Sequence, residues 1–174
     1  MTKISLAELR DRLAKVKLLA LDVDGILTDG GLYYTDTGEE LKKFNSKDGQ
    51  GIKLLMNSGV QVAIISASKS TATLYRGKKL GIPHVFIGIE DKLPTLEQLC
   101  QKLGFDLTEV AYAGDDINDL PIMKAVGCPF TVADAMPQNQ AAAIYVTKLG
   151  GGKGAVREIC NYLLAVKNSP NGSY

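Results

Sequence analysis

The sequence predicts an α/β fold built on a doubly wound parallel sheet. Short apolar runs, such as "KLLALD" (17–22) and "VQVAIIS" (60–66), alternate with longer segments whose apolar residues recur at helical spacing. Several of these helical segments end at a glycine, which commonly closes a helix in a left-handed conformation. Strands that alternate with helices pair in parallel and place helices on both faces of the sheet.

The elements follow one another without an internal repeat or an interdomain linker. Ser5-x-x-Glu8 is a capping-box pattern and predicts a short first helix. Asp36-Thr37-Gly38 has turn composition and predicts a β-hairpin within residues 30–45. The pattern predicts further strands at 17–22, 60–66, 84–88, 109–114, 129–133 and 144–147. It predicts further helices at 50–58, 69–81, 92–104, 117–127 and 154–167. We therefore expect one Rossmann-like domain over residues 1–174, with a flexible tail at 168–174.

Composition excludes several classes of protein. Lys and Arg number 20 against 19 Asp and Glu, so the chain has no broad basic surface for nucleic acid. The first residues lack the apolar core of a signal peptide, and no apolar run approaches the ~20 residues of a membrane span. The cysteines are odd in number and widely spaced, which predicts reduced thiols: Cys100, Cys128 and Cys160. We expect a cytoplasmic protein that binds neither nucleic acid nor membrane.

Polar side chains gather at the predicted carboxyl ends of the strands. Asp22 and Asp24 end the first strand, where residues two apart point the same way and their carboxylates repel each other. Ser66 ends the strand "VQVAIIS", and Lys92 begins a later helix. The segment "GDDIND" (114–119) follows another strand. Because ligands bind beyond the carboxyl ends of parallel strands, we expect these groups to form one site.

The chemistry that fits this set is phosphoryl transfer through an aspartate. A carboxylate can attack phosphorus and form an aspartyl-phosphate, and Asp22 is our candidate. Mg²⁺ suits a cluster of carboxylates and would offset the repulsion between Asp22 and Asp24. Lys92 and Ser66 would hold the phosphate oxygens. Asp24, kept protonated beside its neighbour, would protonate the leaving oxygen and later activate water.

Other interpretations of the same residues remain open. Asp116 could equally cap the following helix, and Asp119 could be a solvated acid in its first turn. A phosphoacceptor receiver domain also uses acids, a hydroxyl and a lysine, but it carries its acceptor aspartate on the third strand. A catalytically silent assembly domain is a further alternative.

The motifs resemble those of the haloacid dehalogenase-like (HAD) phosphatases. "DVDGILT" (22–28) is similar to the first motif, and Ser66, Lys92 and "GDDIND" are similar to the other three. The resemblance implies that Asp22 is the nucleophile and Asp24 the acid/base. It also implies that Mg²⁺ is held by Asp22, the Asp24 backbone carbonyl and Asp115, with support from Asp116 and Asp119.

The short insert after the first strand narrows the resemblance to the capless 3-deoxy-D-manno-octulosonate 8-phosphate (KDO 8-phosphate) phosphatases. This subfamily implies release of KDO and phosphate in lipopolysaccharide precursor synthesis. It implies a homotetramer in which the hairpins of residues 30–45 meet and a neighbouring subunit covers the site in place of a cap. The glycine-rich stretch 150–154 would lie near the site and let the substrate approach closely.

The resemblance also bears on the substrate. Basic residues at Arg76 and Lys79 are expected to bind the sugar acid, and Thr28 is a further candidate. Ala67 and Ser68 stand where the subfamily usually has glycine and arginine. The alternative substrate is therefore a 9-phosphate of a nine-carbon, sialic-acid-type sugar.

Overall fold

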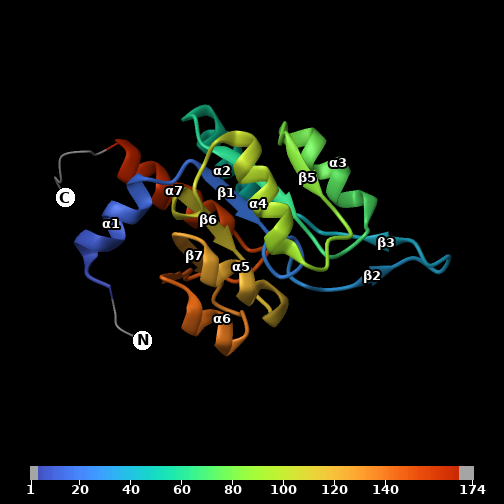
Figure 1. The fold of residues 1–174 in the computed structure, drawn as a ribbon. Helices are drawn as coiled ribbons and strands as arrows, with labels where there is room; N and C mark the ends of the chain where they lie inside the picture. The colour runs from blue at the N-terminus through green and yellow to red at the C-terminus, as the bar shows by residue number, and fades with distance from the viewer. Residues whose placement is uncertain (1–3, 169–174) are drawn as a thin grey trace.

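The computed structural model describes residues 4–168 and shows a parallel sheet between two layers of helices (Figure 1). The strands of the sheet are β1 (Leu18–Leu21), β4 (Gln61–Ile65), β5 (His84–Phe86), β6 (Val110–Ala113), β7 (Cys128–Thr131) and β8 (Tyr145–Val146). Their order is β5-β4-β1-β6-β7-β8, and each neighbouring pair is parallel. The predicted fold class is confirmed.

Helices cover both faces of this sheet. One face carries α1 (Leu6–Ala14), α2 (Ser46–Asn57), α3 (Thr71–Leu80) and α7 (Ala155–Asn168). The other face carries α4 (Lys92–Leu103), α5 (Leu120–Ala125) and α6 (Pro137–Ala142). Two single 3₁₀ turns, η1 (Leu107–Glu109) and η2 (Ile117–Asp119), precede β6 and α5. In the described part of the chain, no helix is long and apolar enough to cross a membrane.

Each face of β1 belongs to a different apolar core. Leu19 and Leu21 pack in the cluster under α1, α2 and α7, whereas Leu18 and Ala20 pack in the cluster under α4 and α5. All four are fully buried. A strand that is buried on both faces shows a continuous apolar run instead of alternation, which is why the sequence identified it.

Two helices differ from the sequence-based expectation. The helix predicted at 50–58 begins at Ser46, because the Asn45 side chain accepts a hydrogen bond from Lys47 N and caps it. Its early turns contain glycines that weaken the helical pattern, yet the packing requires one of them. A Cβ on Gly51 would lie 2.8 Å from Arg157 Cδ of α7. Helix α6 was not predicted, because "PQNQAA" carries no apolar stripe.

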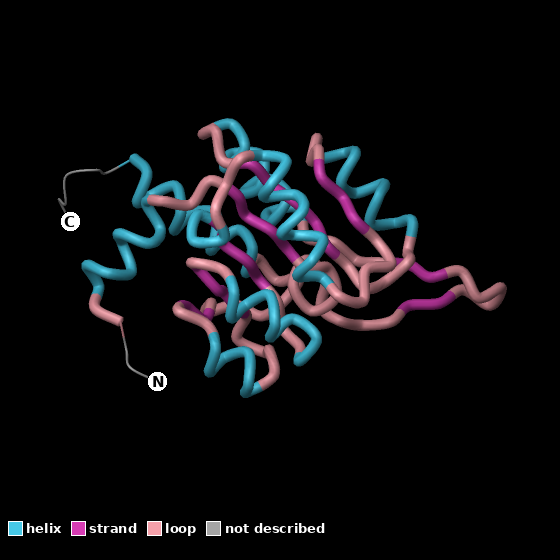
Figure 2. The backbone as a smooth tube through the Cα atoms, viewed as in Figure 1, coloured by secondary structure: helices cyan, strands magenta, loops and turns pink. Residues whose placement is uncertain are grey.

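A two-stranded hairpin is the insert that follows β1. β2 (Tyr33–Tyr34) pairs antiparallel with β3 (Glu40–Leu41), and the hairpin projects from the body of the protein (Figures 1 and 2). Between β1 and α2 the described chain adds nothing else, so no cap domain is inserted there. The predicted tail at 168–174 lies outside the described residues, except for Asn168 at the end of α7.

Candidate active site

Three site residues follow the three central strands of the sheet. Asp22 follows β1, Ser66 follows β4, and Asp115 lies just beyond β6. Since β1 pairs with both β4 and β6, these strand ends meet at one edge. There they line a hollow of about 230 Å³, together with Asp24, Gly25, Ser68 and Asn118. The connection after β1 runs to β4 on one side, and the connection after β6 runs to β7 on the other. Ligands of α/β sheets bind where neighbouring connections diverge in this way.

Lys92 holds two carboxylates together beneath this hollow. Its ammonium lies 2.9 Å from Asp22 Oδ1 and 2.6 Å from Asp119 Oδ1, and its side chain is 1% exposed. Burial alone would lower the pKa of Lys92, but the charges of Asp22 and Asp119 more than offset this and raise it. The buried cation therefore stays charged and fixes the position of Asp22.

Asp22 carries a proton more readily than an ordinary aspartate. Burial and the charge of Asp119 raise the pKa of this carboxyl and Lys92 lowers it, and together they place the pKa at about 7. One lysine shared between two carboxylates does not complete the charge balance. An additional cation at the site would therefore favour the ionised form of Asp22.

Asp119 is the most thoroughly hydrogen-bonded acid of the cluster. Its Oδ1 accepts from Lys92 Nζ at 2.6 Å and from the Tyr112 hydroxyl at 2.7 Å. Its Oδ2 accepts from the backbone N–H groups of Asp115 at 3.0 Å and Asp116 at 3.4 Å. Burial and the charge of Asp119 raise the pKa of Tyr112 well above its ordinary value, so this phenol remains a donor. Asp119 is therefore a fully buried support, not a solvated acid.

Asp115 approaches the loop after β1 closely. Gly25 has φ +80°, and a Cβ there would lie 1.9 Å from Asp115 Oδ2. Only glycine permits both this backbone conformation and this approach. Burial, and then the charges of Asp22, Asp119 and Asp116, together raise the pKa of Asp115 to about 7.

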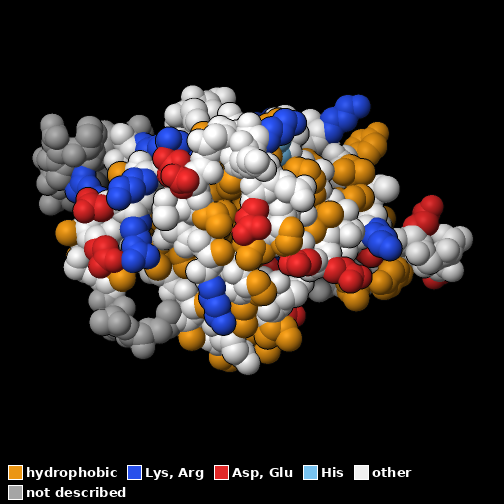
Figure 3. Space-filling view, in the orientation of Figure 1, with side chains coloured by type: hydrophobic (Ala, Val, Ile, Leu, Met, Phe, Trp, Pro, Cys, Tyr) orange, Lys and Arg blue, Asp and Glu red, His pale blue; other side chains and the backbone are white. Residues whose placement is uncertain are grey.

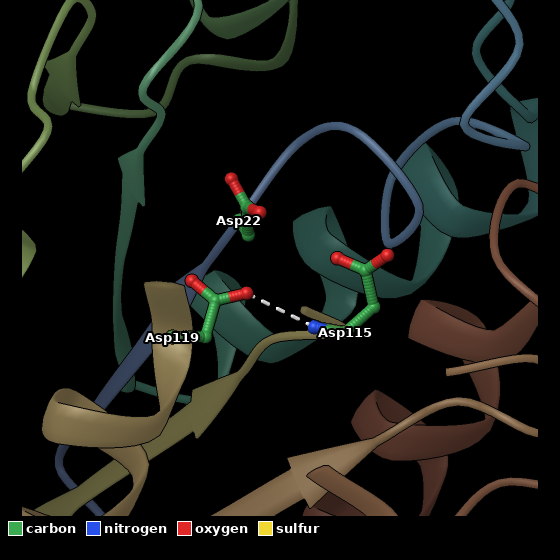
Figure 4. A group of neighbouring side chains, drawn as sticks. All are labelled: Asp22, Asp115 and Asp119. Atoms are coloured by element: carbon green, nitrogen blue, oxygen red, sulfur yellow. Dashed lines mark hydrogen bonds between the residues drawn. The ribbon is translucent and has the colours of Figure 1, made fainter. Parts of the chain in front are cut away.

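The donor set fits a hard divalent cation such as Mg²⁺. Carboxylate oxygens of Asp22, Asp115 and Asp119 lie within 4.8 Å of one another. Figure 4 shows Asp22 on the segment after β1, next to Asp115 and Asp119 on the segment after β6. Because both oxygens of Asp119 already accept hydrogen bonds, Asp22 and Asp115 are the better candidates for direct ligands.

Asp24 has a partner that the sequence analysis did not identify. Lys42, just after β3, places Nζ 2.6 Å from Asp24 Oδ1 and 2.8 Å from Glu40 Oε1. The lysine side chain is 2% exposed. The sequence predicts that a proton on Asp24 relieves its repulsion with Asp22. The structure adds an ammonium against Oδ1 of this carboxylate, which leaves Oδ2 as the oxygen that would carry the proton. Burial alone would lower the pKa of Lys42, but the two acids raise it.

Thr28 does not line the hollow. Its hydroxyl is buried, donates to Val23 O at 3.4 Å and accepts from Gly30 N at 3.2 Å, so it shapes the loop after β1. Ser66 does line the hollow, and its Oγ accepts from Ser68 N at 3.2 Å. The two hydroxyls expected at the site thus differ, because only Ser66 is turned toward the space where a phosphate would fit.

The glycine-rich stretch 150–154 approaches the protein's own backbone. A Cβ on Gly151 would lie 1.8 Å from Gly25 O, and Gly152 N donates to Ile26 O at 3.0 Å. Asp134 accepts from Gly151 N at 2.9 Å and holds the stretch from the other side. These glycines therefore brace the loop after β1. This is a physical reason for them that the sequence analysis did not give.

The structure does not bring Arg76 and Lys79 to the hollow at the strand ends. They line a separate groove of about 430 Å³ between α3 and the base of the hairpin, which Glu40 and Phe44 also line. The Arg76 guanidinium donates to Asn45 O at 3.0 Å and lies 5.6 Å from the centre of the Phe44 ring. Arg76 therefore has a structural contact within its own chain.

Asp116 has the local contact of a capping residue. Its Oδ1 accepts from Ile117 N at 2.6 Å at the start of η2, and the residue is exposed at the rim of the hollow. Of the two interpretations left open for Asp116, the cap has direct geometric support. A supporting contact to a metal-bound water is compatible with the same position.

Lys42 and Tyr112 are the residues that sequence reasoning missed. Tyr112 lies within the apolar strand "VAYA" and had no visible polar partner in the sequence. Lys42 is one of two adjacent lysines, and only its inward position distinguishes it from Lys43, whose side chain is 67% exposed. The period-two alternation after β3 was the available signal, because Leu41 is exposed and the next residue faces inward.

Comparison with known proteins agrees with the family that the motifs resemble. Residues 84–159 match the haloacid dehalogenase-like hydrolase family. The 3-deoxy-D-manno-octulosonate 8-phosphate phosphatase KdsC of Escherichia coli K12 is 46% identical over 149 residues, which cover 86% of this chain and 79% of the relative. The matching enzyme of Yersinia pestis is 43% identical over 162 residues, 93% of this chain and 87% of the relative.

A solved structure extends the agreement to the whole fold. The 3-deoxy-D-manno-octulosonate 8-phosphate phosphatase of Moraxella catarrhalis, in complex with magnesium, phosphate and KDO, is 40% identical. The similarity covers 95% of each chain, with a TM-score of 0.92. The fold, the acidic strand ends and the similarity over nearly the full length lead to one conclusion. The chain belongs to the haloacid dehalogenase-like hydrolases, within the family of the 3-deoxy-D-manno-octulosonate 8-phosphate phosphatases.

Proposed function

We propose that the protein is an Mg²⁺-dependent phosphatase that hydrolyses KDO 8-phosphate to KDO and phosphate. The observation that carries the proposal is the buried ion-pair set at the end of β1, where Lys92 bridges Asp22 and Asp119. This arrangement offers a fixed carboxylate at an open hollow, next to a cluster suited to a divalent cation. The similarity to KDO 8-phosphate phosphatases supports the choice of substrate.

In the first half-reaction, a carboxylate oxygen of Asp22 attacks phosphorus as the bond from phosphorus to the sugar oxygen breaks. The Lys92 ammonium and the Ser66 hydroxyl stabilise the charge on the phosphoryl oxygens. Asp24 gives a proton to the departing sugar oxygen. The products are the free sugar and an aspartyl-phosphate on Asp22.

In the second half-reaction, a water molecule attacks phosphorus and the bond from Asp22 to phosphorus breaks. Asp24, now ionised, takes a proton from this water, so it is restored to the state in which it began. The Asp22 carboxylate is regenerated and phosphate leaves. The proton count therefore closes over one turnover.

Mg²⁺ would be held by Asp22, the Asp24 backbone carbonyl and Asp115, with Asp116 and Asp119 in support. When bound, it supplies positive charge that screens the anionic phosphate from the anionic nucleophile. The chain's own part is to orient these ligands: Asp119 accepts two backbone N–H groups and thereby fixes the loop that carries Asp115.

We further propose that the protein assembles as a homotetramer through the hairpin of residues 30–45. Leu32 is 65% exposed and Tyr34 is 59% exposed on this hairpin, and Figure 3 shows hydrophobic side chains on this part of the surface. A capless site is open to water, so cover from a neighbouring subunit would strengthen the charge interactions within it. Arg76 and Lys79 would then face a substrate bound to a neighbouring subunit.

The test of the function is a substrate panel with purified protein and Mg²⁺. The panel contains KDO 8-phosphate, a nine-carbon sugar 9-phosphate and p-nitrophenyl phosphate, and phosphate release is measured. We expect the highest kcat/KM for KDO 8-phosphate and no turnover in excess chelator. Asp22→Asn serves as the inactive control. Faster hydrolysis of the nine-carbon substrate would replace KDO 8-phosphate, and the absence of turnover on every ester would refute the phosphatase.

A further inference from the structure

The Lys42 ammonium occupies an unusual position for a hairpin residue. Its neighbours Leu41 and Lys43 are largely exposed, yet the Lys42 side chain is 2% exposed and ends between Asp24 and Glu40. Burying a charge is costly unless it is paired and hydrogen-bonded. An apolar residue would fill the same inward position at lower cost. The charge therefore needs a reason beyond packing the hairpin.

The contact joins two parts of the molecule that are otherwise distinct. Asp24 lies on the loop after β1 and lines the hollow, whereas Lys42 follows the second strand of the hairpin. Among residues 4–168, Lys42 is the side chain that donates a hydrogen bond to the Asp24 carboxylate, at 2.6 Å. The direction of this carboxylate is thus set by the hairpin and not by the sheet.

Glu40 makes the arrangement more specific. Glu40 Oε1 lies 2.8 Å from the Lys42 ammonium. The ammonium therefore contacts Glu40 of the hairpin and Asp24 of the loop after β1 at the same time. Asp24 and Glu40 keep side-chain exposures of 35% and 28%, which leaves Asp24 open to the hollow. Lys42 thereby restrains one oxygen of Asp24 without closing the acid off from a ligand.

We propose that Lys42 is a positioning residue that orients the Asp24 carboxylate toward the leaving oxygen and couples this orientation to the placement of the hairpin. This inference rests on the proposed function, in which Asp24 is the proton donor. Lys42 acts through Asp24 and does not contact the phosphate. Its removal should therefore affect esters in proportion to their need for a proton at the leaving group.

The first experiment compares two substrates in Lys42→Met, which keeps most of the length of the unbranched side chain and removes its charge. KDO 8-phosphate releases a poorly leaving sugar oxygen, whereas p-nitrophenyl phosphate releases a good leaving group. We expect kcat to fall roughly ten- to hundredfold on the sugar phosphate and less than about threefold on the aryl ester. Equal losses on both substrates, or no loss on either, would overturn the proposal.

Lys43→Met is the matched control. Lys43 is the adjacent hairpin lysine, and its Nζ lies 2.9 Å from Asp29 Oδ2, away from Asp24. We expect Lys43→Met to keep the wild-type ratio between the two substrates. If it shifted the ratio as much as Lys42→Met, the effect would belong to the hairpin's charge in general and the specific role of Lys42 would be wrong.

A double-mutant cycle with Asp24→Asn tests whether Lys42 acts through Asp24. In that background Lys42→Met should change kcat by less than about twofold, because the group it orients is no longer an acid. A full additional loss would mean that Lys42 acts independently of Asp24. The Lys42→Met/Glu40→Gln variant separates orientation from charge balance: restored turnover would overturn orientation, and a persistent selective loss supports it.

Two further controls keep these outcomes distinct. Should Lys42→Met fail to fold by circular dichroism, Lys42→Arg keeps the charge with a different reach and should show a smaller loss of the same selectivity. Equal losses on both substrates would again refute the role. If the wild-type protein hydrolyses no phosphate ester, the proposed function fails, whereas an active wild type with an unselective Lys42→Met refutes this inference alone.

Discussion

Two regions of the molecule each place a lysine against an aspartate of the first motif. In the strand-end cluster (Asp22, Lys92, Asp115 and Asp119) the sheet and its flanking helices fix the lysine, whereas in the hairpin a two-stranded ribbon carries it. Lys92 is enclosed by the sheet and α4, and it contacts Asp22 and Asp119, which is itself tied to the backbone after β6. Lys42 is equally buried, yet it is carried by a two-stranded hairpin whose apolar side chains are exposed.

This difference separates the site into two parts. The proposed nucleophile Asp22, Lys92 and the acidic cluster lie within one chain, because three neighbouring strands of the sheet position them. The proposed acid/base depends on the hairpin, which contacts the rest of the chain through polar links such as Lys43 to Asp29 and through the partly buried Phe44. We therefore expect nucleophilic chemistry to be insensitive to assembly and proton transfer to be sensitive to it.

The largest expected effect is that of Asp22→Asn. The amide keeps the shape of the side chain but cannot attack phosphorus, so kcat should fall by at least about 10³-fold on every ester. Circular dichroism should show the wild-type fold. Unlike Lys42→Met, this variant should lose activity on good and poor leaving groups alike. Substantial turnover by Asp22→Asn would show that the strand-end cluster does not supply the nucleophile.

The next largest expected effect is on the free energy of unfolding, measured for a substitution of each of the two lysines. Lys92→Met leaves Asp22 and Asp119 buried without their shared cation, and should lower the free energy of unfolding by about 3–5 kcal/mol. Lys42→Met should cost only about 1 kcal/mol, since Asp24 and Glu40 are partly exposed and water can solvate them. Urea denaturation in chelator measures both values. Similar losses would mean that the hairpin is as firmly integrated as the cluster.

The same division separates what the sequence predicts from what it does not. Asp22, Ser66 and Asp115 follow buried strands, and the order of elements in an α/β fold brings such strand ends together. Their convergence therefore needed only the strand pattern. Lys42 could not be assigned in this way, because a hairpin's position relative to the sheet depends on tertiary contacts that no local pattern records.

Arg76 and Lys79 illustrate the same limit in the groove beside the hairpin. Their spacing of three predicts a shared helix face, which the groove between α3 and the hairpin bears out. The spacing does not reveal what opposes that face. Phe44 and the carbonyl of Asn45 occupy part of it, so Arg76 already has a partner within its own chain.

The third prediction concerns pH and the metal within the strand-end cluster. The pKa of Asp115 is raised from 3.8 to about 7 without a cation. Between these values the folded protein holds a proton that the unfolded chain has released, so the stability of the metal-free protein should fall as pH rises toward 7. Mg²⁺ must displace this proton and the proton on Asp22, whose pKa is also raised to about 7. Its affinity should therefore increase with pH below 7, by up to about tenfold per pH unit for each proton displaced.

Calorimetric titration with Mg²⁺ between about pH 6 and pH 8 measures this affinity, together with the protons released. Asp36→Asn is the control, because it removes an exposed acid at the tip of the hairpin and should leave the pH dependence in place. An affinity that did not change with pH would mean that Asp115 is not a ligand or is already ionised.

The smallest expected effect separates assembly from the intact cluster. Leu32→Asp places a charge in the surface that we propose to be shared between subunits, where burying it would be unfavourable. Light scattering should show species smaller than a tetramer, and kcat/KM on KDO 8-phosphate should fall roughly five- to tenfold. Turnover of p-nitrophenyl phosphate should stay within about twofold, because Asp22, Lys92 and the acidic cluster lie within one chain.

Leu6→Asp makes the same change at an exposed leucine of α1, far from the hairpin, and should alter neither quantity (Figure 1). A fully active monomer would show that the hairpin orients Asp24 without help from a neighbouring subunit. Equal losses on both substrates would instead show that the strand-end cluster itself depends on assembly.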